Sequence, residues 1–200
     1  QLDVGSGNTK GGYYNANKTF VPVTFPLGTK SFQRLIESKS KDGINEFIKT
    51  AEQLWRDSLR SVVLNEFFIK REVRNRDNMY ISGGVVWAIA SLIHPQSSNT
   101  NYTEISAQDI SEFRRLLISD YDRLINPDVS FMSYPDQAQA SLKNIGRVLK
   151  TYDRKALLAG TIWFDNLIHE INTVNPSKKF IYVKYAYVGW ISGYIIKKVT

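Results

Sequence analysis

The chain contains no cysteine among its 200 residues, which excludes disulfide frameworks, thiolate zinc sites and cysteine nucleophiles. Histidine is almost as scarce, since His94 and His169 are the two that the sequence has. Two histidines argue against a histidine-rich metal site and against a Ser-His-Asp triad. No run approaches the roughly 18 consecutive apolar residues that indicate a membrane span. We therefore expect a soluble protein with no membrane partner, and the reducing cytoplasm is its default compartment.

A continuous basic tract with interleaved aromatic residues is also missing. Lys and Arg outnumber Asp and Glu by 26 to 19, giving a formal net charge of +7, but the basic residues are spread along the chain. Such a spread is typical of a solvated surface and argues against a nucleic-acid partner. The charge favours smaller anions, such as phosphate chains and nucleotides. Hydrophobic residues are plentiful, at 42% of the chain, and predict one globular domain over residues 1–200.

The first thirty residues predict an antiparallel β-meander. A turn is expected at residues 15–17, and Pro26 and Gly28 close the unit. Further strands are expected at residues 79–81 and 180–185, because β-branched and aromatic residues are dense there. Together these segments predict a five-stranded mixed sheet.

Apolar residues at helical spacing predict helices between these strands. Ser106 and Asp109 form a capping-box pattern at the start of one of them, and residues 97–103 before it form a polar loop. His94 ends a helix that is apolar on all sides, so we expect it to bond the terminal carbonyl groups of that helix. A final turn is expected between Gly189 and Gly193. The predicted helices cover approximately residues 44–63, 84–93, 106–124, 138–149 and 158–171.

The opening stretch DVGSGNT, residues 3–9, suits a phosphate-binding hairpin. Glycines allow backbone N–H groups to approach an anion closely, and short polar side chains add donors. An acid at the end of the preceding strand, Asp3, can hold a hydrated divalent cation beside the phosphates. An ordinary polar turn is the alternative interpretation. The candidate phosphate-binding residues of this stretch are Gly5, Ser6, Gly7, Asn8 and Thr9.

A second glycine pair, Gly83 and Gly84 in ISGG, lies at a predicted strand-to-helix junction. The N-terminus of a helix offers free N–H groups and the positive end of the helix dipole. Gly83 and Gly84 are therefore further candidates for phosphate binding.

The order of the motifs DVGSGNT, FPLGT, ISGG and LLAGTIW resembles the second half of the exopolyphosphatase and guanosine pentaphosphate phosphatase family. The resemblance covers nearly the whole chain. It implies an RNase H-like α/β domain of the actin-like ATPase superfamily, with a mixed sheet, an N-terminal antiparallel meander and helices on both faces. It further implies Mg²⁺ as cofactor, Asp3 as the catalytic and metal-associated acid, and polyphosphate or guanosine polyphosphate as the bound partner.

The resemblance also implies that this chain is a fragment. The family's active site is a cleft between two domains, so a missing N-terminal domain of the same fold would supply the base that activates water. We therefore expect the 200 residues alone to be inactive as a hydrolase.

Three departures from the family pattern keep two other functions open. Lys10 stands where the family has Glu, Ser6 replaces a glycine, and Ile191-Ser192 replaces an Arg-Glu pair. A lysine at position 10 also resembles the phosphate loop of plasmid-segregation actins, which favours an actin-like nucleotide-binding assembly protein. A non-catalytic regulatory module that kept the loop is the other alternative.

Overall fold

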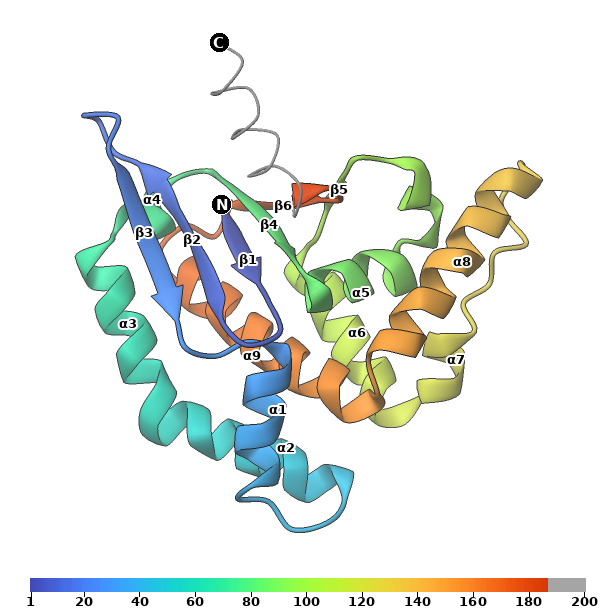
Figure 1. Cartoon of the computed structure of the whole chain (residues 1–200), viewed down its shortest axis with the longest axis horizontal. Coiled ribbons are helices and arrows are strands. Elements are labelled where there is room, and N and C mark those ends of the chain that lie inside the picture. Colours follow the sequence, from blue (N-terminus) through green and yellow to red (C-terminus); the bar gives the residue numbers. More distant parts are fainter. Residues whose placement is uncertain (187–200) are drawn as a thin grey trace.

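The computed structural model describes residues 1–186, which form one six-stranded mixed sheet in the order β3-β2-β1-β4-β6-β5 with its helices (Figure 1). The first three strands form the predicted antiparallel meander. Two more strands run parallel to β1, while β5 runs antiparallel to β6 at the far edge. The strands are β1 (Leu2–Val4), β2 (Thr9–Tyr14), β3 (Phe20–Phe25), β4 (Asn78–Gly83), β5 (Tyr102–Glu104) and β6 (Lys179–Val183).

The sixth strand corrects the prediction of five. Strand β5 overlaps the end of the stretch expected to be a polar loop, residues 97–103, and its three residues pair with β6. A strand of three residues is too short to show the alternation by which strands are recognised. The predicted turn between Gly189 and Gly193 lies outside the described residues.

Alternation along the strands gives the sheet one buried face and one exposed face. Asp3 lies between Leu2 and Val4 on β1, so it points away from the face that those two residues help to bury. The opposite face carries the exposed aromatic residues Tyr14, Phe20, Tyr80 and Tyr102. The buried face carries Leu2, Val4, Val23, Phe25, Met79, Ile81, Phe180 and Tyr182.

The described helices pack on the buried face of the sheet. Phe67 and Trp163, from two different helices, have their ring centroids 5.7 and 5.9 Å from that of Phe25. Within residues 1–186, the expected arrangement with helices on both faces is therefore not found. No described helix is long and apolar enough to cross a membrane.

All five predicted helical stretches contain helix, with changed boundaries. The expected helix over residues 44–63 is α2, a π-helical turn η1 and α3 in succession, and a helix after Gly28 was not expected at all. The helical segments are α1 (Thr29–Glu37), α2 (Ile44–Leu54), η1 (Trp55–Leu59), α3 (Arg60–Ile69), α4 (Glu72–Asn75), α5 (Gly84–Ile93), the 3₁₀ turn η2 (Pro95–Asn99), α6 (Ala107–Ser119), α7 (Tyr121–Ile125), α8 (Pro135–Thr151) and α9 (Arg154–Asn172).

Helix α9 forms the centre of the core. The indole ring of Trp163 lies 5.8 Å from the ring of Phe32 on α1 and 6.0 Å from that of Trp55. Its Nε1 donates a hydrogen bond of 2.8 Å to Thr9 Oγ1, and that hydroxyl donates in turn to the Leu27 carbonyl oxygen at 2.8 Å. Thr9 and Trp163 are both buried, so this pair of bonds fixes the N-terminal hairpin to the core.

The capping box at Ser106 is confirmed. The Ser106 hydroxyl accepts from the Asp109 amide at 3.1 Å, and the Asp109 carboxylate accepts from the Ser106 amide at 2.7 Å. The expectation for His94 is wrong, because its Nε2 lies 3.0 Å from Asp109 Oδ1 rather than at the carbonyl end of α5. Burial raises the pKa of Asp109, but the hydrogen bonds from Ser106 and the contact with His94 outweigh it and leave that pKa lowered.

Replacing Thr9 with valine tests the attachment of the hairpin. Trp163 Nε1 would lose its acceptor and the Leu27 carbonyl its donor in a buried place, so we expect the free energy of unfolding to fall by about 2–4 kcal/mol. Urea denaturation measures the loss. Thr24→Val, on the exposed face of β3, is the matched control. If the two variants were equally stable, the buried hydroxyl would not be what holds the hairpin.

Candidate functional site

The two glycine-containing turns lie side by side at the carboxyl edge of the sheet. Strands β1 and β4 are parallel neighbours, and their register pairs Asp3 with Ser82 and Val4 with Gly83. Ligands of open α/β sheets bind at this edge, where parallel strands end and loops begin. The two sequence motifs, about eighty residues apart in the chain, therefore belong to one place in the fold.

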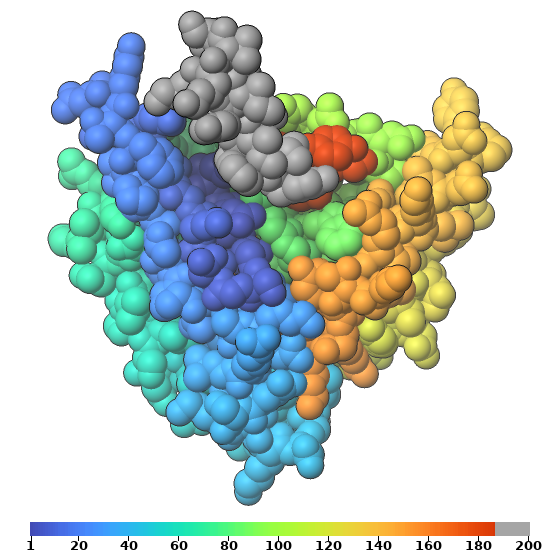
Figure 2. All heavy atoms as spheres, in the orientation of Figure 1, coloured from blue at the N-terminus to red at the C-terminus, as the bar shows by residue number. Residues whose placement is uncertain are grey.

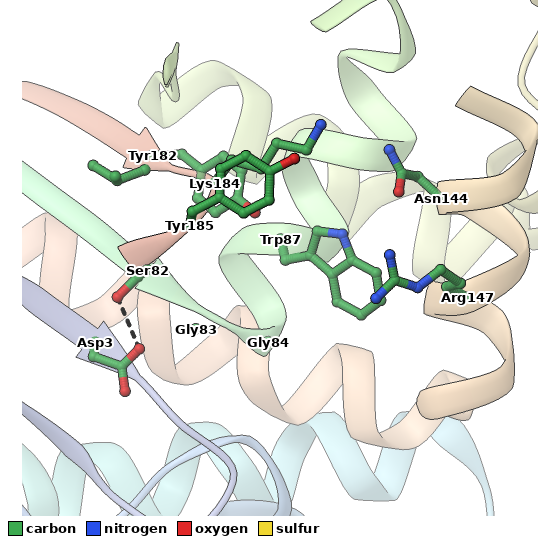
Figure 3. A pocket seen from close by; sticks show the side chains of 11 residues that line it. Asp3, Ser82, Gly83, Gly84, Trp87, Asn144, Arg147, Tyr182, Lys184 and Tyr185 are labelled. Atoms are coloured by element: carbon green, nitrogen blue, oxygen red, sulfur yellow. Dashed lines mark hydrogen bonds between the residues drawn. The ribbon is translucent and has the colours of Figure 1, made fainter. Parts of the chain in front are cut away.

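A pocket of about 270 Å³ opens at this edge (Figure 3). Asp3 and the Ser82–Gly84 turn line one side of it, while α5, α8 and the end of β6 line the rest. In the space-filling view the N-terminal strands and α8 lie on either side of α5 (Figure 2). The lining residues are Asp3, Ser82, Gly83, Gly84, Trp87, Asn144, Arg147, Tyr182, Val183, Lys184 and Tyr185.

Asp3 is held by a hydrogen bond from its neighbouring strand. Its Oδ1 accepts from Ser82 Oγ at 2.8 Å, and Ser82 is itself buried. On the other side, Asp3 pairs across the hairpin with Lys10 of β2, whose side chain is exposed. The carboxylate thus reaches the pocket from a rigid strand, with its second oxygen making no hydrogen bond to a residue of the described chain.

Within residues 1–186, no group of three acidic or histidine side chains could hold a metal ion. Mg²⁺ that arrives with phosphates needs one or two protein carboxylates and keeps several waters. Asp3 can supply one such carboxylate. The site therefore fits a Mg²⁺ ion shared with a phosphate ligand and does not fit an ion held by protein groups alone.

The turn at residues 5–8 faces α1 with its carbonyl groups. Thr29 N donates to the Gly5 oxygen at 2.9 Å, and the amides of Lys30 and Ser31 donate to the Ser6 oxygen at 2.8 and 3.1 Å. The N-terminal amides of α1 are therefore bonded to the turn and not open to an anion. The Ser6 and Gly7 amides make no hydrogen bond within the described chain, so they are the donors that the turn retains for a ligand.

The turn itself does not line the pocket, although it directly follows Asp3 and Val4. Ser6, Gly7 and Asn8 are exposed beside it. Thr9 does not belong to the site, because its hydroxyl is buried and bonded to Leu27 and Trp163. Of the eight residues predicted for the site, the pocket brings together Asp3, Gly83 and Gly84.

Glycine is required at position 83 but not at position 7. Gly83 has a φ of +108°, and a Cβ there would lie 2.1 Å from the Val4 carbonyl oxygen. Gly7 has no positive φ, and no atom lies within 4 Å of its missing Cβ. The close contact of β1 with the start of α5 therefore depends on Gly83. The start of α5 also has no side-chain cap, so its first amides are left for a ligand.

Helix α8 supplies residues that the sequence did not reveal as functional. Arg147 lies with its guanidinium 5.6 Å from the centre of the Trp87 ring, and it makes no ion pair with any residue in the described part of the chain. Asn144 lies one turn before it on the same wall. Lys184, at the end of β6, donates to the Ser98 carbonyl oxygen. Two cations thus lie opposite Asp3 across the pocket.

Tyr152, which follows α8, lies against Gly84 of the glycine pair. Its hydroxyl lies 1.8 Å from the position that a Cβ on Gly84 would take. The side chain is 9% exposed, and the Lys30 ammonium lies 5.6 Å from the centre of its ring. Burial, with a further contribution from the Asp3 charge, raises the pKa of Tyr152. The hydroxyl therefore keeps its proton and can donate a hydrogen bond.

Comparison with protein-family models and with curated proteins finds no match for this chain. The geometry of the pocket is therefore what indicates a function.

The requirement for glycine at position 83 can be measured directly. In Gly83→Ala the alanine must adopt a backbone conformation that is essentially confined to glycine. Its Cβ must also displace the Val4 carbonyl group. We expect the free energy of unfolding to fall by at least about 2 kcal/mol. Gly7→Ala is the control, with no expected change beyond a few tenths of a kcal/mol. Comparable losses in the two variants would contradict the asymmetry.

Proposed function

We propose that this chain is a domain that binds a phosphate chain or the phosphates of a nucleotide, within an exopolyphosphatase-like phosphoanhydride hydrolase. The observation that carries the proposal is the junction of Asp3, Gly83 and Gly84 at the uncapped N-terminus of α5, facing a pocket with two cations. A helix N-terminus binds anions through its free amides and its dipole. An acid beside it is useful where the anion carries a divalent cation.

The sheet supports the fold that this proposal needs. An antiparallel meander β1–β3, followed by strands β4 and β6 added parallel on the other side of β1, is the arrangement expected of an RNase H-like domain of the actin-like ATPase superfamily. We propose that the domain is of this kind. In such a domain the ligand would lie at the carboxyl edge of β1 and β4, where the pocket is found.

The charge of each group in the pocket suggests its role in binding. The Arg147 guanidinium and the α5 amides would bind phosphate oxygens, while the Asp3 carboxylate would repel them unless a cation lay between. Mg²⁺, held by Asp3 and by the phosphates, would neutralise charge that develops on the transferring group. Ser82 would keep Asp3 in the orientation that the ion requires, through its bond of 2.8 Å.

The pocket lacks the groups for complete phosphoanhydride hydrolysis. That reaction needs an oriented water, a base to accept its proton and charge stabilisation on both sides of the phosphoryl group. Among its lining residues the pocket has one carboxylate, Asp3, and no histidine. We propose that a missing N-terminal domain of the same fold supplies the opposite wall and the base.

An actin-like nucleotide-binding protein remains the second candidate, favoured by the far wall of the pocket. Trp87 and Tyr185 line that wall beside Asn144. Aromatic faces and an amide suit a nucleoside base, whereas a bare phosphate chain has no apolar surface to place there. A nucleotide bound with much higher affinity than a polyphosphate of equal charge would favour this candidate.

Arg147→Ala tests whether the pocket binds phosphate. We expect its affinity for tripolyphosphate with Mg²⁺, measured by titration calorimetry, to fall at least about tenfold, because a charged hydrogen-bond donor is lost. Arg123→Ala removes the same charge from an exposed position on α7 and controls for the general attraction of a chain with net charge +7. Equal affinities for both variants would exclude the pocket as the phosphate site.

Phosphate release tests whether this domain binds phosphate without hydrolysing it. With Mg²⁺ and polyphosphate, the 200-residue chain should release phosphate no faster than its Asp3→Asn variant, since the base and the opposite wall are lacking. Asparagine keeps an oxygen that can accept from Ser82, so the fold is preserved. A rate about tenfold or more above that of the variant would show that one domain suffices.

A further inference from the structure

Tyr152 presents an unpaired hydroxyl at the glycine pair. The side chain is 9% exposed, and its hydroxyl makes no hydrogen bond to any residue of the part that the structure describes. The hydroxyl oxygen is not sealed from solvent, so water or a ligand can reach it. The buried hydroxyls of Ser82 and Ser141, by contrast, each bond to a group of the chain. The Tyr152 hydroxyl therefore lacks a partner in the chain itself.

A second unpaired hydroxyl, that of Thr29, shows what distinguishes Tyr152. Thr29 has no exposed surface, and its hydroxyl lies 3.0 Å from the position of a Cβ on Gly160 in the core helix α9. No ligand can reach it there. Tyr152, by contrast, lies against Gly84, which is both the first residue of α5 and part of the pocket wall.

The ring of Tyr152 is held so that its hydroxyl stays at this position. Lys30 lies over the ring at 5.6 Å from its centre, and the Lys30 amide donates to the Ser6 carbonyl oxygen at 2.8 Å. The same lysine therefore touches both the ring and the turn that follows Asp3. Gly84 has no side chain to displace the hydroxyl, which gives a reason for glycine at this position besides close approach of an anion.

We propose that the Tyr152 hydroxyl is a ligand-binding and specificity-determining donor, which hydrogen-bonds an oxygen of the phosphate group held at the N-terminus of α5. This inference rests on the function proposed above, because it names a further residue of the same site. A phosphate oxygen beside Gly84 would give the hydroxyl the partner that it lacks. The hydroxyl would also select for ligands with an acceptor at that place.

Tyr152→Phe tests the role of the hydroxyl, because phenylalanine keeps the ring and its contact with Lys30. We expect the affinity for tripolyphosphate with Mg²⁺, measured by titration calorimetry, to fall by about 5- to 50-fold. The midpoint of urea unfolding without ligand should stay unchanged, since no internal bond is lost. Tyr121→Phe is the matched control, because Tyr121 also lies under a cation, Arg154 at 5.1 Å, but outside the pocket.

Three outcomes would overturn the inference, and they differ in what they imply. Unchanged affinity in Tyr152→Phe, with tight binding by the wild-type chain, would refute the role of the hydroxyl and leave the proposed function intact. A lower unfolding midpoint with unchanged affinity would show that the hydroxyl has an internal partner. Failure of the wild-type chain to bind tripolyphosphate at all would overturn both proposals.

Discussion

The hydrogen bond from Trp163 to Thr9 is the interaction on which the rest of the structure depends. It joins the central helix α9 to the first residue of β2, and the Thr9 hydroxyl passes the connection on to Leu27. Both side chains are buried, and in a low-dielectric interior a lost partner costs more than at the surface. These bonds therefore hold the hairpin against the core, and they hold the turn that follows Asp3 with it.

From that attachment the geometry of the pocket follows in steps. The hairpin fixes β1, and the parallel pairing of β1 with β4 brings Asp3 beside Ser82 and Val4 beside Gly83. The carbonyl groups of Gly5 and Ser6 then accept hydrogen bonds from the first amides of α1. The same contacts that satisfy the start of α1 thus leave the start of α5 as the uncapped helix end at the pocket.

The pocket combines charges of both signs. One carboxylate faces two cations and a helix N-terminus, which suits the binding of an anion that carries a metal ion. Among the lining residues in the described part of the chain, Asp3 is the one carboxylate and none is a histidine. Binding of a phosphate anion and hydrolysis of a phosphoanhydride are separate properties, and binding requires fewer groups than hydrolysis does.

Local sequence determined much of this protein. Alternation and turn residues predicted the meander, the Gly83 junction and the capping box at Ser106, because these depend on neighbours in the chain. Helix α1 was missed because its buried apolar residues, Phe32 and Ile36, make too short a stripe for periodicity to detect. The three residues of β5 were missed for the same reason.

Part of the candidate site could be predicted from the sequence, and part of it could not. Asp3, Gly83 and Gly84 could be found from the sequence because they belong to short motifs with a known chemistry. Arg147 on α8 and Tyr152 just after it could not, since in the sequence they resemble a solvated cation and a core aromatic. Which helix lies beside the pocket is set by packing between distant segments, such as that of Trp87 with Arg147. The tertiary structure alone decided that Thr9 belongs to the core and that α8 forms the far wall, because contacts between residues far apart in the chain leave no periodic trace in it.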